Sequence, residues 1–240
     1  MSEAQMIRFL PLTLCAVISA CTPVLIETPQ PQPVMQAAAP VSPRLSQRQA
    51  VDNFEFVVRR VKPVAEQFCR TRSQQPNCDF QIVIDSRAER GVNAFQTLDR
   101  AGRPVIGFTV PLIAEARNRD ELAFVLAHEA AHHIRGHIAR QQQNAAVGGL
   151  LVGALAGALG AADIEGAQRI GASVGARTYS KDFELEADAL GTQIAAAAGF
   201  DPLRGAEFFF RIPDPGDRFL GTHPPNADRV RTVQRVAAGL

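Results

Sequence analysis

Apolar residues recur every three or four positions in the first strongly patterned stretch of the chain, at Val51, Phe54, Val57, Val58 and Val61. This spacing puts them on one face of an amphipathic helix, which we expect to run from Ser46 to about Arg70. Pro63 lies inside that stretch and is expected to kink or restart the helix, because proline removes a backbone hydrogen bond.

The pattern then changes to short apolar runs separated by turn-forming residues. Three of these runs predict short strands: FQIVID (80–85), VNAFQ (92–96) and PVIGFTV (104–110). Helical spacing returns after Asn118, where Glu121 gives a weak capping signal, and we expect this helix to reach about Gln141. Further helices are expected over about 178–199 and from about Asn226. The predicted fold class is α+β, mostly helical, with one small sheet beside the motif-bearing helix.

The segment NAAVGGLLVGALAGALGAAD (144–163) carries no charged residue before its final aspartate. Its apolar run, 145–162, lies at the lower length limit for a membrane span, but alanine and glycine make it only weakly hydrophobic. Glycines recur in it at every fourth position, which suits close helix packing in water or in lipid. Two interpretations stand: a hairpin that is buried or flanks the functional site, and a segment that touches a membrane.

The N-terminus has the pattern of an export signal. One basic residue, Arg8, precedes an apolar run that is too short to span a bilayer comfortably. Ile18-Ser19-Ala20-Cys21 resembles a bacterial lipobox, so we expect residues 1–20 to be a removed lipoprotein signal peptide and Cys21 to be lipidated. A plain signal peptide is the alternative. Thr22 follows, rather than the aspartate that favours inner-membrane retention, which predicts an outer-membrane lipoprotein facing the periplasm.

Residues 21–45 are rich in proline and are expected to form an extended tether from Cys21 to a domain over 46–240. The 240-residue chain has ordinary globular composition and a net charge of +1, which argues against nucleic acid as a partner. Cys69 and Cys78 remain for the exported domain, and in an oxidising periplasm we expect them to form a structural disulfide. A cysteine metal site would need more ligands than this neighbourhood offers.

Four of the five histidines lie in one short stretch, LAHEAAHHIRGH (126–137). On a helix, His128 and His132 share a face and can bind one ion together. Glu129 is rotated by about 100° from His128, close enough to reach a water on that ion without being a ligand. This His-Glu-x-x-His arrangement is typical of zinc peptidases, in which the glutamate takes a proton from the metal-bound water. A chance match on an amphipathic helix is the alternative.

The other two histidines of the cluster do not fit the same site. On one straight helix, His133 and His137 are rotated by about 140° and 180° from His128, so we expect them to support the site from outside or to lie at the helix end. A third ligand must come from elsewhere in the chain. The run KDFELEADALG (181–191) offers two pairs of carboxylates at helical spacing, and periodicity alone does not choose between them: Asp182 with Glu186, and Glu184 with Asp188.

Together, the segments HEAAH (128–132), YSKDFELEAD (179–188) and GTHPPNADRV (221–230) resemble the HtpX-like family of zinc metallopeptidases. This family also includes the type I CAAX prenyl proteases, the mitochondrial Oma peptidases and several periplasmic lipoproteins. VNAF (92–95) and AAGFDPLRGAEFFFRI (197–212) follow the family's order as well. The resemblance covers essentially all of residues 50–236 and implies a compact peptidase domain of gluzincin type.

The resemblance implies roles for individual residues. Glu184 would be the third zinc ligand, and Asp188 would orient a zinc-bound imidazole. His223 would either steady the transition state or cap the metal as a removable fourth ligand, and Arg229 would assist at the same place. Asn93 would lie on an edge strand beside the cleft, where a peptide substrate can add as a strand; a turn residue is the alternative.

These observations predict a lipid-anchored zinc metalloendopeptidase of the bacterial envelope with one Zn²⁺ per chain, held by His128, His132 and Glu184. Glu129 would activate the attacking water and pass its proton to the leaving amine. The expected substrates are misfolded or stalled envelope proteins, and the expected membrane contact is the anchor, with or without the 145–162 segment. The alternative function is an outer-membrane chaperone or assembly factor that contains zinc but cleaves little, because His223 caps the metal.

Overall fold

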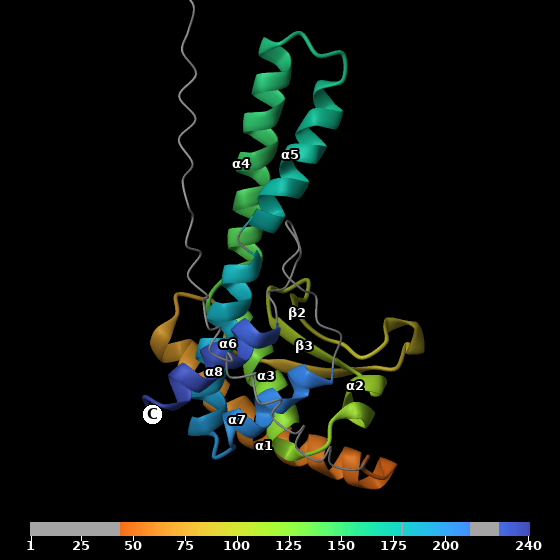
Figure 1. Cartoon of the computed structure of the whole chain (residues 1–240), viewed down its shortest axis with the longest axis vertical. Helices are drawn as coiled ribbons and strands as arrows, with labels where there is room; N and C mark the ends of the chain where they lie inside the picture. Colours follow the sequence, from red (N-terminus) through yellow and green to blue (C-terminus); the bar gives the residue numbers. More distant parts are fainter. Residues whose placement is uncertain (1–43, 179, 212–225) are drawn as a thin grey trace, which may run out of the picture. The chain divides into compact units, whose positions relative to one another are not determined.

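The computed structural model describes residues 44–178, 180–211 and 226–240. They form a mostly helical α+β fold with one small sheet, which confirms the predicted class (Figure 1). Its elements in chain order are α1 (Gln47–Arg72), β1 (Gln81–Asp85), η1 (Ala88–Arg90), β2 (Ala94–Leu98), β3 (Pro104–Thr109), α2 (Val110–Glu115), α3 (Arg119–Ile134), α4 (His137–Ala158), α5 (Ile164–Thr178), α6 (Ser180–Ala197), α7 (Pro202–Gly205), η2 (Ala206–Phe210) and α8 (Asn226–Ala237).

Helix α1 begins at a capping box. The Ser46 hydroxyl accepts a hydrogen bond from the Gln49 N–H at 3.3 Å, and the Gln49 side chain accepts one from the Ser46 N–H at 3.0 Å. The helix continues through Pro63 as one element, so the predicted restart there is wrong. Its buried face packs against α3 and holds Ala50, Phe54, Val57, Val61, Ala65 and Cys69.

The three strands are ordered β1-β3-β2. β3 pairs in parallel with β1 and antiparallel with β2, so β2 is an edge strand, and no described strand pairs with its outer side. Phe95 of β2 lies opposite Gly107 of β3, and its ring occupies the space that a Cβ at Gly107 would need. β3 leads directly into α2, a short helix that the hydrophobic pattern did not predict.

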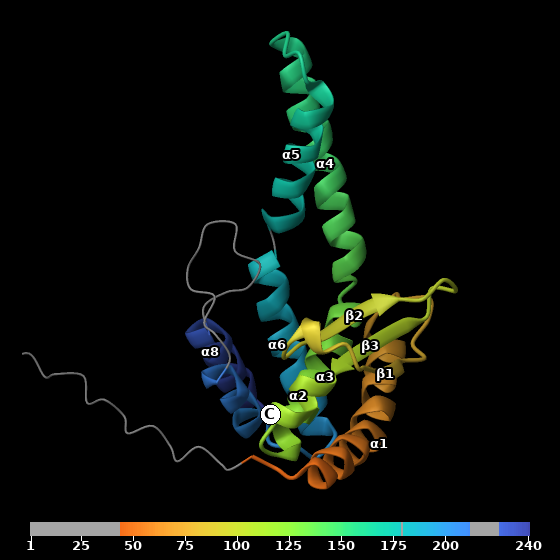
Figure 2. The ribbon, with the colours of Figure 1, turned by 90° about the vertical axis from the view of Figure 1, so that its right-hand side faces the viewer.

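Helix α3 is the centre of the fold. It packs against α1, α6 and the sheet (Figure 2). Every residue from Glu121 to His128 is buried. One of its close helix contacts is with α6 at Gly191. A Cβ there would lie 3.0 Å from the backbone nitrogen of His128 and 3.1 Å from its Cα. Glycine at 191 therefore allows the backbone of α6 to approach the motif helix at its first histidine.

The motif helix ends earlier than the sequence suggests. It was expected to reach about Gln141, but α3 stops at Ile134 and α4 begins at His137. The chain turns at Gly136, whose φ of 67° is left-handed and readily adopted by glycine. His137 consequently starts a new helix with a new direction, and its position cannot be calculated from one straight helix.

Helices α4 and α5 form a hairpin that extends away from the sheet and the other helices (Figures 1 and 2). They pack tightly on each other, and the turn between them contains Gly160 with a φ of 71°. The uncharged run 145–162 thus forms most of α4 and the turn. Its large apolar side chains are exposed, so this part of the chain is not a buried hairpin. None of the described helices has both the length and the hydropathy needed to cross a bilayer.

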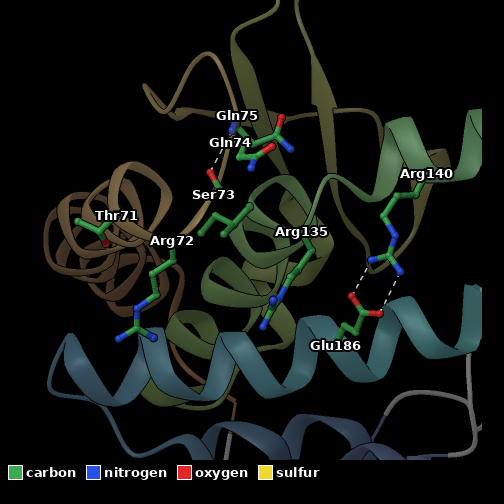
Figure 3. A pocket seen from close by; sticks show the side chains of 9 residues that line it. Thr71, Arg72, Ser73, Gln74, Gln75, Arg135, Arg140 and Glu186 are labelled. Atoms are coloured by element: carbon green, nitrogen blue, oxygen red, sulfur yellow. Dashed lines mark hydrogen bonds and ion pairs between the residues drawn. The ribbon is translucent and has the colours of Figure 1, made fainter.

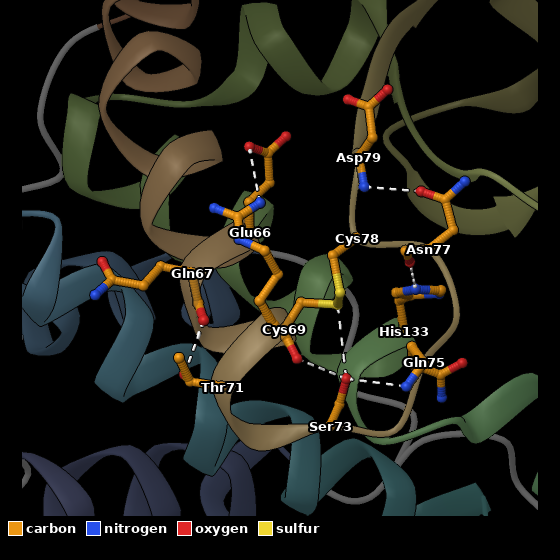
Figure 4. Close-up of a disulfide and its surroundings, with 11 residues drawn as sticks. Glu66, Gln67, Cys69, Thr71, Ser73, Gln75, Asn77, Cys78, Asp79 and His133 are labelled. Atoms are coloured by element: carbon orange, nitrogen blue, oxygen red, sulfur yellow. Dashed lines mark hydrogen bonds and ion pairs between the residues drawn. A yellow bond between two sulfur atoms is a disulfide. The ribbon is translucent and has the colours of Figure 1, made fainter.

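The predicted disulfide between Cys69 and Cys78 is present and joins the end of α1 to the segment before β1 (Figure 4). Within the loop that it closes, the Asn77 carbonyl lies 2.7 Å from Nε2 of His133, which donates a hydrogen bond to it. Phe80 packs edge-on against the same imidazole, with ring centroids 5.4 Å apart. His133 therefore fastens the disulfide loop to the motif helix.

Candidate metal centre

Helices α3 and α6 bring together the three predicted ligands. The Nε2 atoms of His128 and His132 lie 3.0 Å apart, as expected for residues one helical turn from each other. The Glu184 carboxylate faces both rings: its Oε2 lies 3.4 Å from Nε2 of His128, and its Oε1 lies 3.4 Å from Nε2 of His132. These donor atoms all lie within 4.8 Å of one another, and His128 and Glu184 are buried. Two imidazoles and one carboxylate at this spacing form a group that can hold a metal ion.

The first histidine is oriented by a buried carboxylate and an arginine. Nδ1 of His128 donates to Asp188 at 2.9 Å. Arg229 of α8 binds both oxygens of Asp188 at 2.8 Å, and its guanidinium lies over the Phe209 ring at 3.9 Å. Asp188 is fully buried, so this bidentate pair satisfies a charge that water cannot reach. Its bond to Nδ1 leaves Nε2 of His128 as the ligand atom.

The second histidine has its own supporting contacts. Nδ1 of His132 lies 2.8 Å from Nδ1 of His137, and Nε2 of His137 lies 3.2 Å from Glu186. Arg140 donates two hydrogen bonds to Glu186, at 2.7 and 3.1 Å (Figure 3). With Nε2 of His132 turned toward Glu184, its Nδ1–H is donated to His137, and the Nε2–H of His137 is donated to Glu186. Each of the two imidazoles is thus connected by hydrogen bonds to a carboxylate of α6 that is paired with an arginine. His128 reaches Asp188 directly, and His132 reaches Glu186 through His137.

The pKa values agree with these hydrogen bonds. Burial opposes protonation of His128, but its bonds to Asp188 and Glu184 outweigh burial and raise its pKa to about 9. Burial and the neighbouring His128 lower the pKa of His132 to about 3. Burial also lowers the pKa of His137, so that ring is neutral at pH 7 and carries one N–H. In the metal-free protein the His128 ring therefore holds a second proton at pH 7, which must leave before Nε2 can bind a metal, whereas the His132 ring is already neutral.

The remaining predicted residues have different positions. Glu129 is half-buried, next to His128 on α3. Burial lowers the pKa of Arg229, but the charges of Asp188, Glu184 and Glu129 hold it above its usual value. Asn93 is exposed just before β2 and is not part of the cluster; its backbone N–H donates to the Thr109 hydroxyl at 3.0 Å. His223 and Cys21 lie outside the described residues.

Sequence reasoning did not identify Glu186 and Arg140 as parts of this centre. Glu186 belongs to one of two carboxylate pairs that helical spacing leaves equivalent, and no local pattern marks Arg140 as part of the site. The missed signal was Gly136, since a glycine in the left-handed conformation commonly ends a helix. A polar pocket of about 590 Å³ borders this second set of contacts; Arg140 and Glu186 line it, but none of the three possible ligands does (Figure 3).

The fold and the site define a class. Two histidines one turn apart, a glutamate after the first of them and a carboxylate from a second helix are the arrangement of His-Glu-x-x-His metallopeptidases. The sequence pattern of "Peptidase family M48" matches residues 55–237, so this chain belongs to that family.

The chain is also similar to bacterial proteins that are named as proteases. It is 32% identical over 159 residues to a provisionally named beta-barrel assembly-enhancing protease of Vibrio cholerae, covering 59% of this chain and 32% of that protein. It is 32% identical to the beta-barrel assembly-enhancing protease of Yersinia pestis and 31% identical to that of Escherichia coli K12, in each case over 50% of this chain and 28% of the relative. The matches thus span about a third of the length of these relatives.

Proposed function

We propose that this protein is a zinc-dependent metalloendopeptidase of the bacterial cell envelope. The observation that carries the proposal is the convergence of His128, His132 and Glu184, with Glu129 on the same helix as the two imidazoles. Membership of peptidase family M48 supports hydrolysis of peptide bonds, and the donor set of two imidazoles and a carboxylate supports zinc rather than magnesium or calcium.

In this mechanism His128, His132 and Glu184 hold the metal. Zinc, when bound, acts as a Lewis acid toward the scissile carbonyl and lowers the pKa of a coordinated water to about 7. Glu129 is the general base: it takes the proton of the attacking water and passes it to the leaving amine. The proton on Nδ1 of each imidazole stays in its hydrogen bond to Asp188 or His137, so each ring keeps Nε2 directed at the metal.

Three further residues receive proposed roles. Arg229 orients the first ligand through Asp188, which its burial and bidentate pairing support. His223 would lie near the reacting carbonyl or cap the metal in the resting protein. Asn93 precedes the edge strand β2, whose outer side is free of any described strand and suits a peptide that adds in extended form.

We further propose that the substrates are misfolded or stalled envelope proteins. The names of the relatives connect those proteins with assembly of β-barrels, and the matches span about a third of the length of those proteins. The lipobox-like Ile18-Ser19-Ala20-Cys21 and the proline-rich segment after it support a lipid-anchored outer-membrane lipoprotein. Cleavage would then occur at the periplasmic surface of that membrane.

The test is cleavage of casein or another unfolded protein by the purified chain, with zinc content measured by plasma mass spectrometry. Wild type is expected to bind one zinc and cleave, and Glu129→Gln is expected to keep zinc but lose at least about 100-fold in rate, the usual effect of removing a general base. His223→Ala is included to release a capped metal. Full zinc occupancy without cleavage in both wild type and His223→Ala would contradict the peptidase function and favour a chaperone or assembly factor.

A further inference from the structure

The α4–α5 hairpin has its small residues inside and its large apolar residues outside. Gly148 faces Gly171, and a Cβ on Gly148 would lie 2.3 Å from the Gly171 carbonyl oxygen. Gly153 is covered by the side chain of Gln168, and Gly175 contacts Asn144. The two helices therefore touch through glycines along most of their length. In water, the hydrophobic effect favours the reverse arrangement, with leucines in the contact and small residues outside.

The exposed apolar side chains of α4 form one stripe. They are Val147 at 55% exposure, Leu150 at 70%, Leu151 at 67%, Val152 at 37% and Leu155 at 60%, followed by Leu159 at 77% just after the end of the helix. Most of them are three or four residues from another member of the set, and Val147, Leu150 and Leu151 lie on the side of α4 that is turned away from α5. On α5, Ile170 and Val174 are also exposed. This hairpin holds most of the large apolar side chains that the described part of the chain exposes.

The stripe has no charged border. No Asp, Glu, Lys or Arg occurs in residues 141–162, and residues 145–162 are all Ala, Val, Gly or Leu. A face that binds another protein from water carries a polar rim around its apolar centre, and this helix has none along those residues. In lipid, apolar side chains gain nothing by turning inward, so helices there associate through small residues and leave the large ones outside. The composition and the packing both indicate lipid.

The hairpin does not have the geometry of a spanning element. α4 has 22 residues, which is about 33 Å of helix, and it lacks the hydropathy of a membrane span. Charged residues also lie at the far end. Asp163 accepts a hydrogen bond from the Gly166 N–H at 2.7 Å, and Glu165 pairs with Arg169 at 2.7 Å. These charges would oppose insertion of the tip into hydrocarbon, so a hairpin lying along the membrane surface is favoured.

We propose that the α4–α5 hairpin lies in the interfacial layer of a lipid bilayer, with the stripe from Val147 to Leu159 facing the acyl chains. The distance from the proposed anchor allows this contact. From Cys21 to Arg44, the first described residue, there are 44 − 21 = 23 residues, which span up to about 70 Å when rich in proline. A segment of that reach would be compatible with contact between the stripe and the membrane that holds a lipid on Cys21.

Tryptophan fluorescence tests the proposal directly, because the chain contains no tryptophan. Leu151→Trp puts a single probe in the stripe, and Leu203→Trp puts one at a site of 48% exposure on α7 as the matched control. The full chain is mixed with vesicles of phosphatidylethanolamine and phosphatidylglycerol, with and without brominated acyl chains. The probe at 151 is expected to shift to shorter wavelength and to lose most of its intensity on brominated lipid, and the probe at 203 to do neither.

A second variant separates lipid contact from other causes. Adding Leu155→Glu to the Leu151→Trp protein is expected to abolish the shift, whereas adding Leu203→Glu is expected to leave it unchanged, with the same circular dichroism and zinc content in both. If the emission wavelength and intensity of the probe at position 151 do not change when vesicles are added, the proposal is overturned. A blue shift that is present without vesicles and grows with protein concentration would overturn it as well, and would assign the stripe to pairing between two copies of the chain.

Discussion

Nδ1 of His132 lies 2.8 Å from Nδ1 of His137, although the two residues belong to different helices. The contact exists because the chain leaves α3 after Ile134 and turns at Gly136. His137 then stacks on Phe183 of α6, with centroids 4.6 Å apart and planes inclined by 9°, which fixes the ring that receives the His132 proton. The histidine that appears to point away from the metal centre in a straight helix is therefore the one that orients its second imidazole.

Replacement of His137 by alanine should weaken zinc binding by about 10- to 100-fold, the usual effect of removing a group that orients a metal ligand. The quantity to measure is the zinc dissociation constant, by competition with a chromophoric chelator. His133→Ala is the matched control: it breaks the contact with Asn77, which affects stability, but leaves the hydrogen bonds of His132 in place. Equal zinc affinity of His137→Ala and wild type would show that this hydrogen bond does not act on the metal.

Replacement of Arg229 by alanine should destabilise the fold by about 3–5 kcal/mol, because it leaves the buried charge of Asp188 without its partner. Urea unfolding of the zinc-free protein measures this loss without any contribution from metal binding. Arg231 lies on the same helix with 66% of its side chain exposed, so Arg231→Ala should change stability by no more than about 0.5 kcal/mol. Similar stabilities for the two variants would be inconsistent with a structural role for the Arg229–Asp188 pair.

Replacement of Gly191 by alanine should destabilise the protein by about 1–3 kcal/mol, since the new Cβ would press on the backbone of His128 and neither helix can yield freely. Zinc affinity should fall too, because the displaced atoms carry a ligand. Gly157→Ala is the control: its Cβ would meet only Ile164 Cδ1, at 3.7 Å, so alanine should be neutral or should stabilise the helix. Calorimetry measures the stability of both variants. If Gly191→Ala is as stable as wild type, the contact between α3 and α6 adjusts easily to the added methyl group.

The ion pair between Asp85 and Arg87 should make the stability of the fold depend on pH in the acid range. The side-chain hydrogen bond from Arg87 lowers the pKa of Asp85 to about 2, below the value of about 3.9 expected in the unfolded chain. A carboxylate with a depressed pKa stabilises the fold above the unfolded value, and this contribution is lost as the pH falls from about 4 to about 2. Urea unfolding of wild type and Asp85→Asn should therefore differ at pH 5 and converge near pH 2. A constant difference over this range would argue against the pair.

The sequence was informative where one local rule determines the structure. The helix start at Asn118, the disulfide between Cys69 and Cys78 and the shared face of His128 and His132 each follow from short-range spacing, and the structure contains all three. The choice between Glu184 and Glu186 did not follow, because both lie on α6 near the rings and only tertiary packing decides which ring each one meets.

The hairpin was the least predictable part of the fold. Glycine and alanine in residues 145–162 are compatible with a helix in water, in a core or in lipid, so periodicity did not determine their environment. The position of α5 depends on contacts such as that between Gly148 and Gly171, which involve no side chain and leave no hydrophobic pattern in the sequence. The same physical reason explains why the motif helix seemed continuous: its end depends on the left-handed conformation of one glycine.

Gly136 has a consequence for how the protein can move. One residue sets both the direction of α4, about 33 Å long, and the position of His137 at its first turn. Arg140, which holds Glu186 beside His137, is on the same first turn. A tilt of the hairpin about Gly136 would displace both side chains together, so the orientation of the exposed leucines and the hydrogen bond on His132 cannot change independently.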